Sequence, residues 1–132
     1  MTRRVWGMLL AVLMLLPAGC GTPAQFAGTW VAVQASPEPL VAGTRVTIIF
    51  DNSSTVTGSS GCNGYGSRNT KVSNGRLDMS QTAVTLMACA APGVMEQEAR
   101  FLALLNSTPE IRVDGDRLTL SDFTTTFTFV RS

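Results

Sequence analysis

The sequence predicts a mainly β domain, in which a small antiparallel barrel or strongly curled sheet packs against one amphipathic α-helix. Three observations support this fold class. Roughly eight to ten short runs alternate apolar and polar residues between turn signals. Asn-Gly and Asp-Gly dipeptides, which two-residue hairpin turns favour, each join two of these runs. One segment alone has the periodicity of a helix instead.

The N-terminal residues predict an export signal and not a part of the domain. Arg3 and Arg4 precede an apolar run over residues 5–16, and small residues then lead to Cys20. The run is shorter than the roughly 20 residues that span a bilayer, which disfavours a permanent transmembrane helix. A cysteine after such a run is typical of bacterial lipoproteins, in which it is acylated and becomes the mature N-terminus. Pro17 stands where leucine is usual, and a secreted protein that is cut nearby is the alternative.

We therefore divide the chain into a signal peptide over residues 1–20 with lipidation at Cys20, a tether over residues 21–27 and a folded domain over residues 28–132. Without the residues before Cys20, eight basic and nine acidic residues remain, so the mature chain has a net charge of −1. A near-neutral domain offers no positive surface to nucleic acid. We expect a monomer that is anchored by its lipid to a membrane of the bacterial envelope and faces the extracytoplasmic side.

The first strands are expected in order along the chain. Residues 28–33 are expected to form the first strand, and residues 36–43 are expected to form a loop. Residues 45–51 and 54–59 are expected to pair through a turn at Asn52-Ser53. The last residues, 124–132, alternate phenylalanine with threonine and predict the closing strand.

Two hairpins have stronger signals. Asn74-Gly75 lies within the alternating residues 71–79, and Asp114-Gly115 lies within residues 111–120. Both dipeptides favour the positive φ angles of a type I′ turn, so each predicts a tight hairpin centred on the dipeptide.

Residues 92–106 predict the single helix, with Pro92 in its first turn. Glu96 and Arg100 lie four residues apart and are expected on its polar face. The apolar face is expected to pack on the core, and its residues are Met95, Ala99, Phe101, Leu102 and Leu105.

Catalysis is not indicated. The chain contains no histidine, which removes Ser-His and Cys-His nucleophile pairs and most zinc chemistry. The acidic residues are dispersed over expected strand ends, turns and the polar helix face, and include Asp51, Asp78, Glu96, Glu98, Asp114 and Asp116. Two convergent carboxylates, as glycoside hydrolysis needs, are not predicted. We expect a non-enzymatic protein with no cofactor and no metal site.

Cys62 and Cys89 remain after Cys20, and two cysteines outside the cytoplasm usually pair. A disulfide between them would contribute about 3 kcal/mol to stability in the chain-entropy account. A nucleophilic Cys62 is the disfavoured alternative, because a reactive thiolate needs a base, a helix N-terminus or a cation beside it, and only Arg68 is near in sequence.

The glycine-rich stretch 58–67 is expected to shape a tight turn around Cys62. Gly61, Gly64 and Gly66 allow positive φ angles or close backbone contacts. Asn63 is expected to bond the backbone of this same turn. No Gly-Lys-Ser sequence and no Rossmann spacing follows, so a phosphate-binding loop is not predicted.

Trp30 lies in the sequence Gly-Thr-Trp at the start of the first strand. This is similar to the Gly-x-Trp of lipocalin-like barrels, in which the indole closes one end. We expect Trp30 to be a core residue of this kind, with stacking on a ligand as the alternative, and Tyr65 to pack in the core as well.

Six motifs follow one another along the mature chain. They are GTW at 28–30, GSSGCNGY at 58–65, SNGRL at 73–77, TAVTLMAC at 82–89, MEQEARFLALL at 95–105 and VDGDRLTL at 113–120. In this order they resemble the META domain, the family of HslJ-like heat-inducible bacterial lipoproteins. Thr85 then matches the threonine four residues before the second cysteine, and Glu96 or Glu98 matches the acid of the helix.

The resemblance implies a barrel-like β domain of lipocalin-type topology with one helix, located in the bacterial envelope. It also implies a link to heat or novobiocin stress and, in some members, to secretion or motility. It assigns no catalytic residues. We therefore expect a binding or stress-response role with an unknown envelope protein or small ligand.

Two other roles remain open. A small-ligand carrier would need an apolar cavity of several hundred Å³, whereas an interior filled by Phe50, Leu77, Leu118 and Phe127 would exclude it. An inhibitor of a secreted hydrolase would present the loop at residues 58–67 as its reactive surface.

Overall fold

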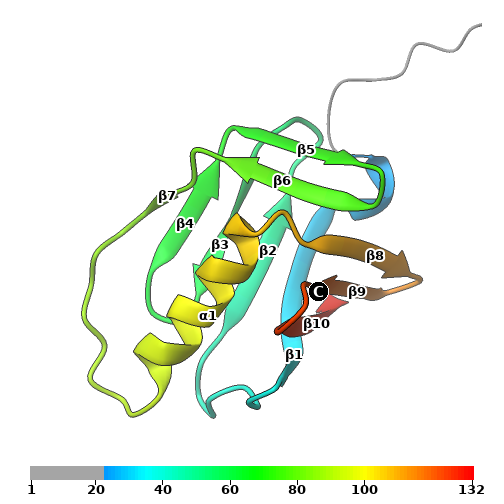
Figure 1. Cartoon of the computed structure of the whole chain (residues 1–132). Helices are drawn as coiled ribbons and strands as arrows, with labels where there is room; N and C mark the ends of the chain where they lie inside the picture. The colour runs from blue at the N-terminus through cyan, green and yellow to red at the C-terminus, as the bar shows by residue number, and fades with distance from the viewer. Residues whose placement is uncertain (1–22) are drawn as a thin grey trace, which may run out of the picture.

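The structure is a computed structural model that describes residues 23–132. The predicted signal peptide and its lipidation site Cys20 lie outside the described residues. Figure 1 shows a strongly curled sheet that wraps around one helix. None of the described helices is long and apolar enough to cross a membrane.

The described residues form ten strands and one α-helix, which confirms the mainly β fold class. The strands are β1 Gly28–Ser36, β2 Val46–Phe50, β3 Val56–Ser60, β4 Gly64–Ser67, β5 Asn69–Ser73, β6 Arg76–Ser80, β7 Ala83–Val84, β8 Glu110–Asp114, β9 Arg117–Ser121 and β10 Thr126–Arg131. The helix α1 spans Val94–Asn106, and a short 3-10 helix, η1, spans Ala24–Phe26 before the first strand.

All ten strands belong to one antiparallel sheet with the order β5-β6-β8-β9-β10-β1-β2-β3-β4-β7. Apart from the short β7, this is the order of an up-and-down barrel that is open between β4 and β5. The barrel-like prediction is therefore confirmed in the form of a curled half-barrel. The helix α1 lies against the concave side of the sheet (Figure 1).

The interior of the half-barrel is filled by large side chains. Phe101 of α1 is fully buried and its ring lies 5.6 Å from Tyr65, 5.0 Å from Phe127 and 6.1 Å from Phe129, measured between ring centroids. The four residues whose burial would exclude a carrier, Phe50, Leu77, Leu118 and Phe127, are all buried in this core. Apolar burial of this kind is the main stabilising contribution to the fold.

The two predicted hairpins both form, but only one has the predicted turn. Asn74 and Gly75 have φ angles of 51° and 70° and connect β5 to β6. In the β8–β9 hairpin the turn lies one residue later, because Asp114 pairs with Arg117 and only Gly115 has a positive φ. This register places Val113 opposite Leu118 and Ile111 opposite Leu120, whereas the predicted turn would place Val113 opposite an aspartate.

The buried face of α1 differs from the predicted one. Met95 and Ala99, both expected in the core, are exposed. The buried residues of α1 are Val94, Gln97, Glu98, Phe101, Leu104 and Leu105. Gln97 can be buried because its side chain accepts from the backbone N–H of Val41 (2.7 Å) and donates to Thr44 Oγ1 (3.0 Å).

The folded part begins before Gly28, where the tether was expected to end. Phe26 of η1 is buried, and its ring lies 5.8 Å from that of Phe50. The same residue accepts a hydrogen bond from the indole N–H of Trp30, at 2.7 Å from its carbonyl oxygen. Phe26 therefore forms part of the core, whereas Ala24 and Gln25 of the same 3-10 helix are exposed.

Candidate functional site

The glycine-rich stretch consists mainly of sheet. Its residues belong to β3 and β4, and only Gly61, Cys62 and Asn63 form the turn between these strands. Gly58 is needed for close approach, since a Cβ atom there would lie 2.1 Å from the carbonyl oxygen of Thr47. The φ of Gly61 is +108°, which favours glycine. Gly64 has neither a positive φ nor a close neighbour, so the expectation for this glycine was wrong.

A disulfide joins this turn to the segment that follows β7. Cys62 and Cys89 are bonded, with their Cα atoms 6.0 Å apart. The predicted disulfide is therefore present. We name the two joined segments, residues 61–63 and 85–89, the stapled loops.

Asn63 is the centre of the contacts between the stapled loops. Its side-chain oxygen accepts from the backbone N–H of Met87 (2.6 Å) and from Thr85 Oγ1 (2.9 Å). Its Nδ2 donates to the carbonyl oxygen of Met87 (3.0 Å) and to Glu98 Oε1 (2.6 Å). The side chain of Asn63 thus bonds a distant segment and the helix, and the expected bond to the backbone of its own turn is made by its carbonyl oxygen, which accepts from the N–H of Ser60 (2.9 Å).

Glu98 connects the stapled loops to α1. Its side chain accepts from Ser60 Oγ (2.5 Å) and from the backbone N–H of Asn63 (2.7 Å), in addition to Asn63 Nδ2, and the residue is only 5% exposed. Burial by itself raises the pKa of Glu98, but the hydrogen bonds from Ser60, Asn63 and the Cys62 backbone outweigh it and hold the pKa below its ordinary value. Glu98 is therefore a structural carboxylate and is poorly suited to be a general acid.

The structure distinguishes the two acids of the helix by their surroundings. Glu98 contacts Asn63, whereas Glu96 is exposed. Sequence reasoning placed both on the polar face. The spacing Val94, Glu98, Phe101, Leu105 is that of one helix face, and this was the signal that could have identified Glu98 as buried.

Thr85 completes the set of predicted motif residues. Its hydroxyl accepts from the backbone N–H of Gly64 (3.1 Å), and its own N–H donates to the Gly64 carbonyl oxygen (3.0 Å). The structure therefore brings Cys62, Asn63, Thr85 and Cys89 together at one site, with Gly61 beside them. Trp30 is not part of it.

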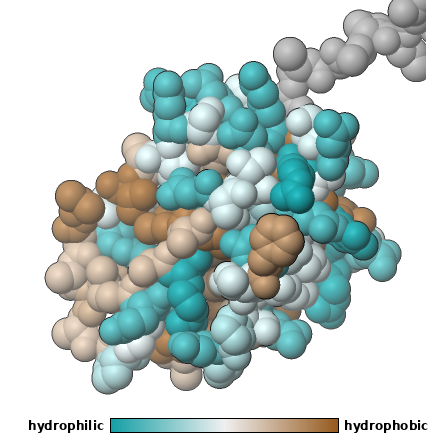
Figure 2. Space-filling view, in the orientation of Figure 1, coloured by the Kyte–Doolittle hydropathy of each residue, from teal (hydrophilic) through white to brown (hydrophobic). Residues whose placement is uncertain are grey.

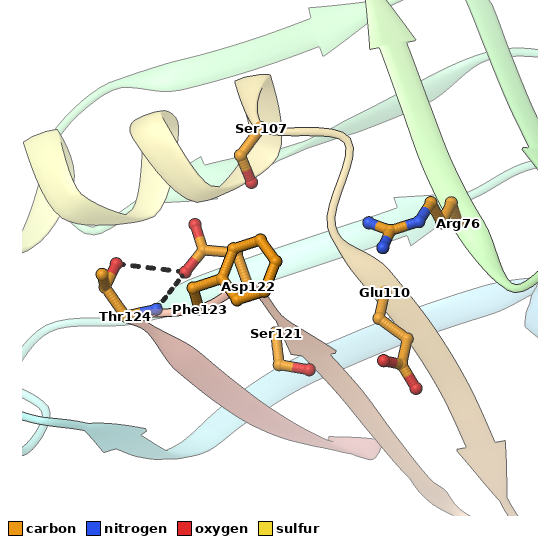
Figure 3. A pocket seen from close by; sticks show the side chains of 7 residues that line it. All are labelled: Arg76, Ser107, Glu110, Ser121, Asp122, Phe123 and Thr124. Atoms are coloured by element: carbon orange, nitrogen blue, oxygen red, sulfur yellow. Dashed lines mark hydrogen bonds between the residues drawn. The ribbon is translucent and has the colours of Figure 1, made fainter.

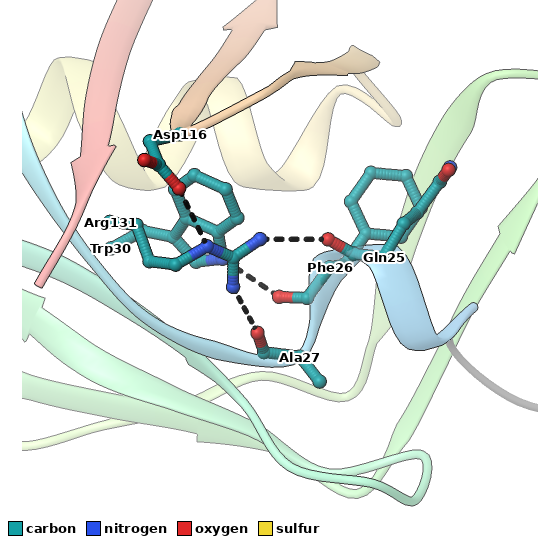
Figure 4. A network of polar contacts seen from close by, with 6 residues as sticks. All are labelled: Gln25, Phe26, Ala27, Trp30, Asp116 and Arg131. Atoms are coloured by element: carbon teal, nitrogen blue, oxygen red, sulfur yellow. Dashed lines mark hydrogen bonds and ion pairs between the residues drawn. The ribbon is translucent and has the colours of Figure 1, made fainter.

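Trp30 lies fully buried at another part of the half-barrel, near η1 (Figure 4). The guanidinium carbon of Arg131 is 4.1 Å from the centroid of the indole ring. Arg131 also donates to the carbonyl oxygens of Ala27 (2.5 Å) and Gln25 (3.2 Å) and forms an ion pair with Asp116 (3.4 Å). The indole is therefore enclosed by the protein itself, which leaves no free ring face for a ligand.

The acidic residues do not form a recognisable catalytic group. Within residues 23–132, no three His, Cys, Asp or Glu side chains are placed to hold a metal ion. Glu110 and Asp122 line one shallow pocket, but Glu110 forms an ion pair with Arg112, and the pKa of Asp122 is lowered. The lowered pKa of Asp122 keeps this carboxyl ionised at neutral pH, so it does not supply the protonated acid that glycoside hydrolysis requires.

The stapled loops carry exposed apolar side chains. Leu86 is 96% exposed, Met87 is 57% exposed and Met95 of α1 is 37% exposed. The backbone N–H of Cys89 donates to the sulfur of Met95 (3.5 Å), so this side chain lies against the same loop. Figure 2 shows hydrophobic residues gathered on this side of the molecule, over β7 and the loop into α1. We name Leu86, Met87 and Met95 the apolar surface.

The fold and the site together define a class of small β domain, in which a curled sheet encloses one helix and buried Asn63 and Glu98 hold two disulfide-linked loops to it. The chain belongs to the META domain family, whose family model matches residues 24–132.

Two solved structures are similar to this chain. One is an NMR structure that is 26% identical in sequence to this chain and superposes with a TM-score of 0.71. The match covers 83% of this chain and 94% of the chain in that structure. The other, an NMR structure of a protein from Burkholderia xenovorans, shares 23% identity with a TM-score of 0.66 and covers 96% of this chain and 99% of its own. A search of curated proteins finds no match. These comparisons support the family and the fold and name no activity.

Proposed function

We propose that this protein is a lipoprotein of the bacterial envelope, anchored through Cys20, that acts in envelope stress by binding a protein partner and not by catalysis. The apolar surface on the stapled loops is the binding surface. Exposed apolar side chains that gather in one patch mark interaction sites more often than single exposed residues do. Methionine is frequent at such sites, because its flexible side chain adapts to different partners.

The observation that carries this proposal is the rigid support beneath the apolar surface. Asn63 bonds both the N–H and the carbonyl oxygen of Met87, and the disulfide holds Cys89 two residues further on. Leu86 and Met87 are thus exposed on a backbone that is fixed in place. Binding then costs little loss of loop entropy, which is how preorganised surfaces gain affinity.

The position of the apolar surface favours a protein over a lipid bilayer as its partner. The chain enters the domain at η1, at the upper right of Figure 1, whereas the loop between β7 and α1 lies at the lower left. A domain attached to a membrane through its N-terminal segment would therefore direct the apolar surface away from that membrane. This orientation suits an extracytoplasmic protein with an apolar segment.

The two alternative roles are less well supported. A carrier needs an open interior, and the interior is filled by aromatic and aliphatic side chains. An inhibitor that presents residues 58–67 needs a protruding loop, but Ser60 and Asn63 are buried and bonded to Glu98.

The partner prediction can be tested by site-specific crosslinking in cells. A photoreactive residue at Leu86 of the full chain is expected to give one discrete crosslinked protein, and the same residue at Val33, a 50% exposed apolar position on β1, is expected to give none. With that protein purified, Met87→Ser should weaken binding about tenfold, which corresponds to about 1.4 kcal/mol. Crosslinks to lipid alone, or equal crosslinking from both positions, would contradict the proposal.

The proposed lipid anchor at Cys20 can be tested separately. The mature protein is expected to begin at Cys20 and to carry acyl chains, and its processing should stop when lipoprotein signal peptidase is inhibited by globomycin. Cys20→Ala should release the domain from the membrane fraction. Mass spectrometry of the purified protein measures the acyl chains directly, and an unmodified N-terminus at another residue would show that the protein is secreted instead.

A further inference from the structure

A pocket lies on a different part of the surface from the stapled loops. It is a hollow of about 290 Å³ between the C-terminal end of α1, the start of β8 and the β9–β10 turn (Figure 3). Its lining residues are Arg76, Ser107, Glu110, Ser121, Asp122, Phe123 and Thr124. The volume is near the lower end of small-molecule sites, about 300 Å³, and so suits a ligand of the size of one amino acid.

Three charged side chains line this pocket: Glu110 pairs with Arg112, and the other two, of opposite charge, lie on different walls. Figure 3 shows the Arg76 guanidinium on one side and the Asp122 carboxylate on the other. The ion pairs within residues 23–132 are Arg100–Glu38, Arg112–Glu110 and Arg131–Asp116. Arg76 donates to the carbonyl oxygen of Thr108 (3.1 Å), and neither it nor Asp122 has an ionic partner among these residues. Both charges are thus available to a ligand.

The turn holds Asp122 in position. Its Oδ1 accepts from the N–H of Thr124 (2.8 Å), the N–H of Thr125 (2.8 Å) and the hydroxyl of Thr124 (3.1 Å). Burial raises the pKa of Asp122, but the hydrogen bonds from Thr124, Thr125 and Ser107 outweigh it and keep the pKa below its ordinary value. The carboxylate is therefore ionised at neutral pH, and its other oxygen points toward Ser107 at the pocket (Figure 3).

Phe123 supplies an apolar face beside these charges. The residue lies in the same turn, lines the pocket and is fully exposed. Large aromatic side chains are usually buried in monomeric domains. A fully exposed ring next to Arg76 and Asp122, two opposite charges that are not paired with each other, suits a ligand that has an apolar part as well as both charges.

We propose that this pocket binds a free α-amino acid with an apolar or aromatic side chain. The ligand carboxylate pairs with Arg76, the ligand ammonium pairs with Asp122 beside the hydroxyl groups of the pocket, and the ligand side chain packs on Phe123. Guanidinium groups bind carboxylates with two parallel hydrogen bonds, which fixes the orientation of the ligand. This inference is independent of the apolar surface and of its partner.

The test is an NMR titration of the mature full chain in detergent micelles with L-phenylalanine. The expected result is saturable shifts of the backbone amides of residues 121–125 and of Arg76. N-acetyl-L-phenylalanine lacks the ammonium and L-phenylalaninamide lacks the carboxylate, so each should bind at least about tenfold more weakly. The dipeptide of two phenylalanines, in which the two charges are further apart, distinguishes a free amino acid from a peptide: if the dipeptide binds more tightly, the assignment to a free amino acid is wrong.

Two variants test the residues. Arg76→Gln and Asp122→Asn preserve size, and the asparagine oxygen can still accept the hydrogen bonds of the turn. Each is expected to weaken phenylalanine binding about tenfold, whereas Arg117→Gln on β9, outside the pocket, should leave it unchanged. The proposal fails if phenylalanine gives no saturable shift at residues 121–125, if both analogues bind as well as phenylalanine, or if both pocket variants bind normally while their spectra show an intact fold.

Discussion

Replacing Glu98 with alanine is expected to lower the free energy of unfolding by about 3 to 4 kcal/mol. The Ser60 hydroxyl, the Asn63 N–H and the Asn63 side-chain amide would lose their common acceptor. The Asn63 N–H would be left without a partner, which costs about 1–3 kcal/mol, and the Ser60 hydroxyl and the Asn63 amide would each lose a bond to a charged acceptor while keeping a carbonyl oxygen. The loss also weakens the attachment of the stapled loops to α1, so their amide hydrogens should exchange faster.

Urea unfolding measures this effect, and Glu96→Ala is the matched control. Glu96 is two residues away on the same helix and is exposed, so its replacement should change the free energy of unfolding by less than about 0.5 kcal/mol. Equal effects of the two substitutions would show that the hydrogen bonds of Glu98 contribute nothing specific.

The lowered pKa of Glu98 predicts that the free energy of unfolding depends on pH. Because the folded pKa of Glu98 lies below its ordinary value of 4.5, the carboxylate contributes its full stabilisation above that value and loses it as the pH falls through the lower folded pKa. The difference in unfolding free energy between the natural protein and Glu98→Gln should therefore be largest near neutral pH and decrease on acidification. Asp51 and Asp122, whose pKa values are also lowered, contribute to both proteins and cancel in this difference. A difference that stays constant with pH would contradict the assignment.

Removing the Cys62–Cys89 disulfide is expected to have the second large effect on the stability of the fold. The double variant Cys62→Ala, Cys89→Ala is expected to lose about 3 kcal/mol of stability, because the unfolded chain is no longer restrained over a sequence separation of 27 residues. Reduction of the natural protein should produce a similar loss in a urea titration. Alkylation of the oxidised protein provides the control: no thiol should react at Cys62 or Cys89, and two modified cysteines would show that the bond is absent.

The disulfide variant also separates stability from binding. In the variant Asn63 still bonds Met87 and Thr85 still bonds Gly64, so the loop at residues 85–89 loses its covalent attachment and keeps these hydrogen bonds. We therefore expect the apolar surface to bind its partner more weakly in the variant at a temperature where the domain remains folded. Unchanged affinity there would mean that rigidity of the loop is unimportant for binding.

The features that sequence reasoning predicted are those that neighbouring residues determine. Asn74-Gly75 forms its hairpin because these residues tolerate positive φ angles at the two central positions. Phe127 and Phe129 are buried because alternate residues of a strand point to the same face of the sheet. The pairing of Cys62 with Cys89 follows from their number once Cys20 is assigned to the export signal.

Sequence reasoning did not predict the position of the β8–β9 turn or the buried face of α1. At the turn, the pairing of Val113 with Leu118 outweighs the local preference of Asp114-Gly115. On the helix, apolar Met95 is exposed and charged Glu98 is buried, which reverses the order that hydrophobicity predicts. A pattern in one segment contains no information on the donors that another segment supplies.

The sequence by itself determined the fold class, most of the strands and the cysteine pair of this protein, because alternation, turn chemistry and residue count act locally or over the whole chain. Only the tertiary structure decided that Glu98 and not Glu96 is buried against Asn63, that Asn63 bonds Met87, and that Arg76 lines one pocket with Asp122. Each of these depends on atoms brought together from distant segments. Burial of a polar group is favourable only where such partners are present, so its position is decided by the folded molecule.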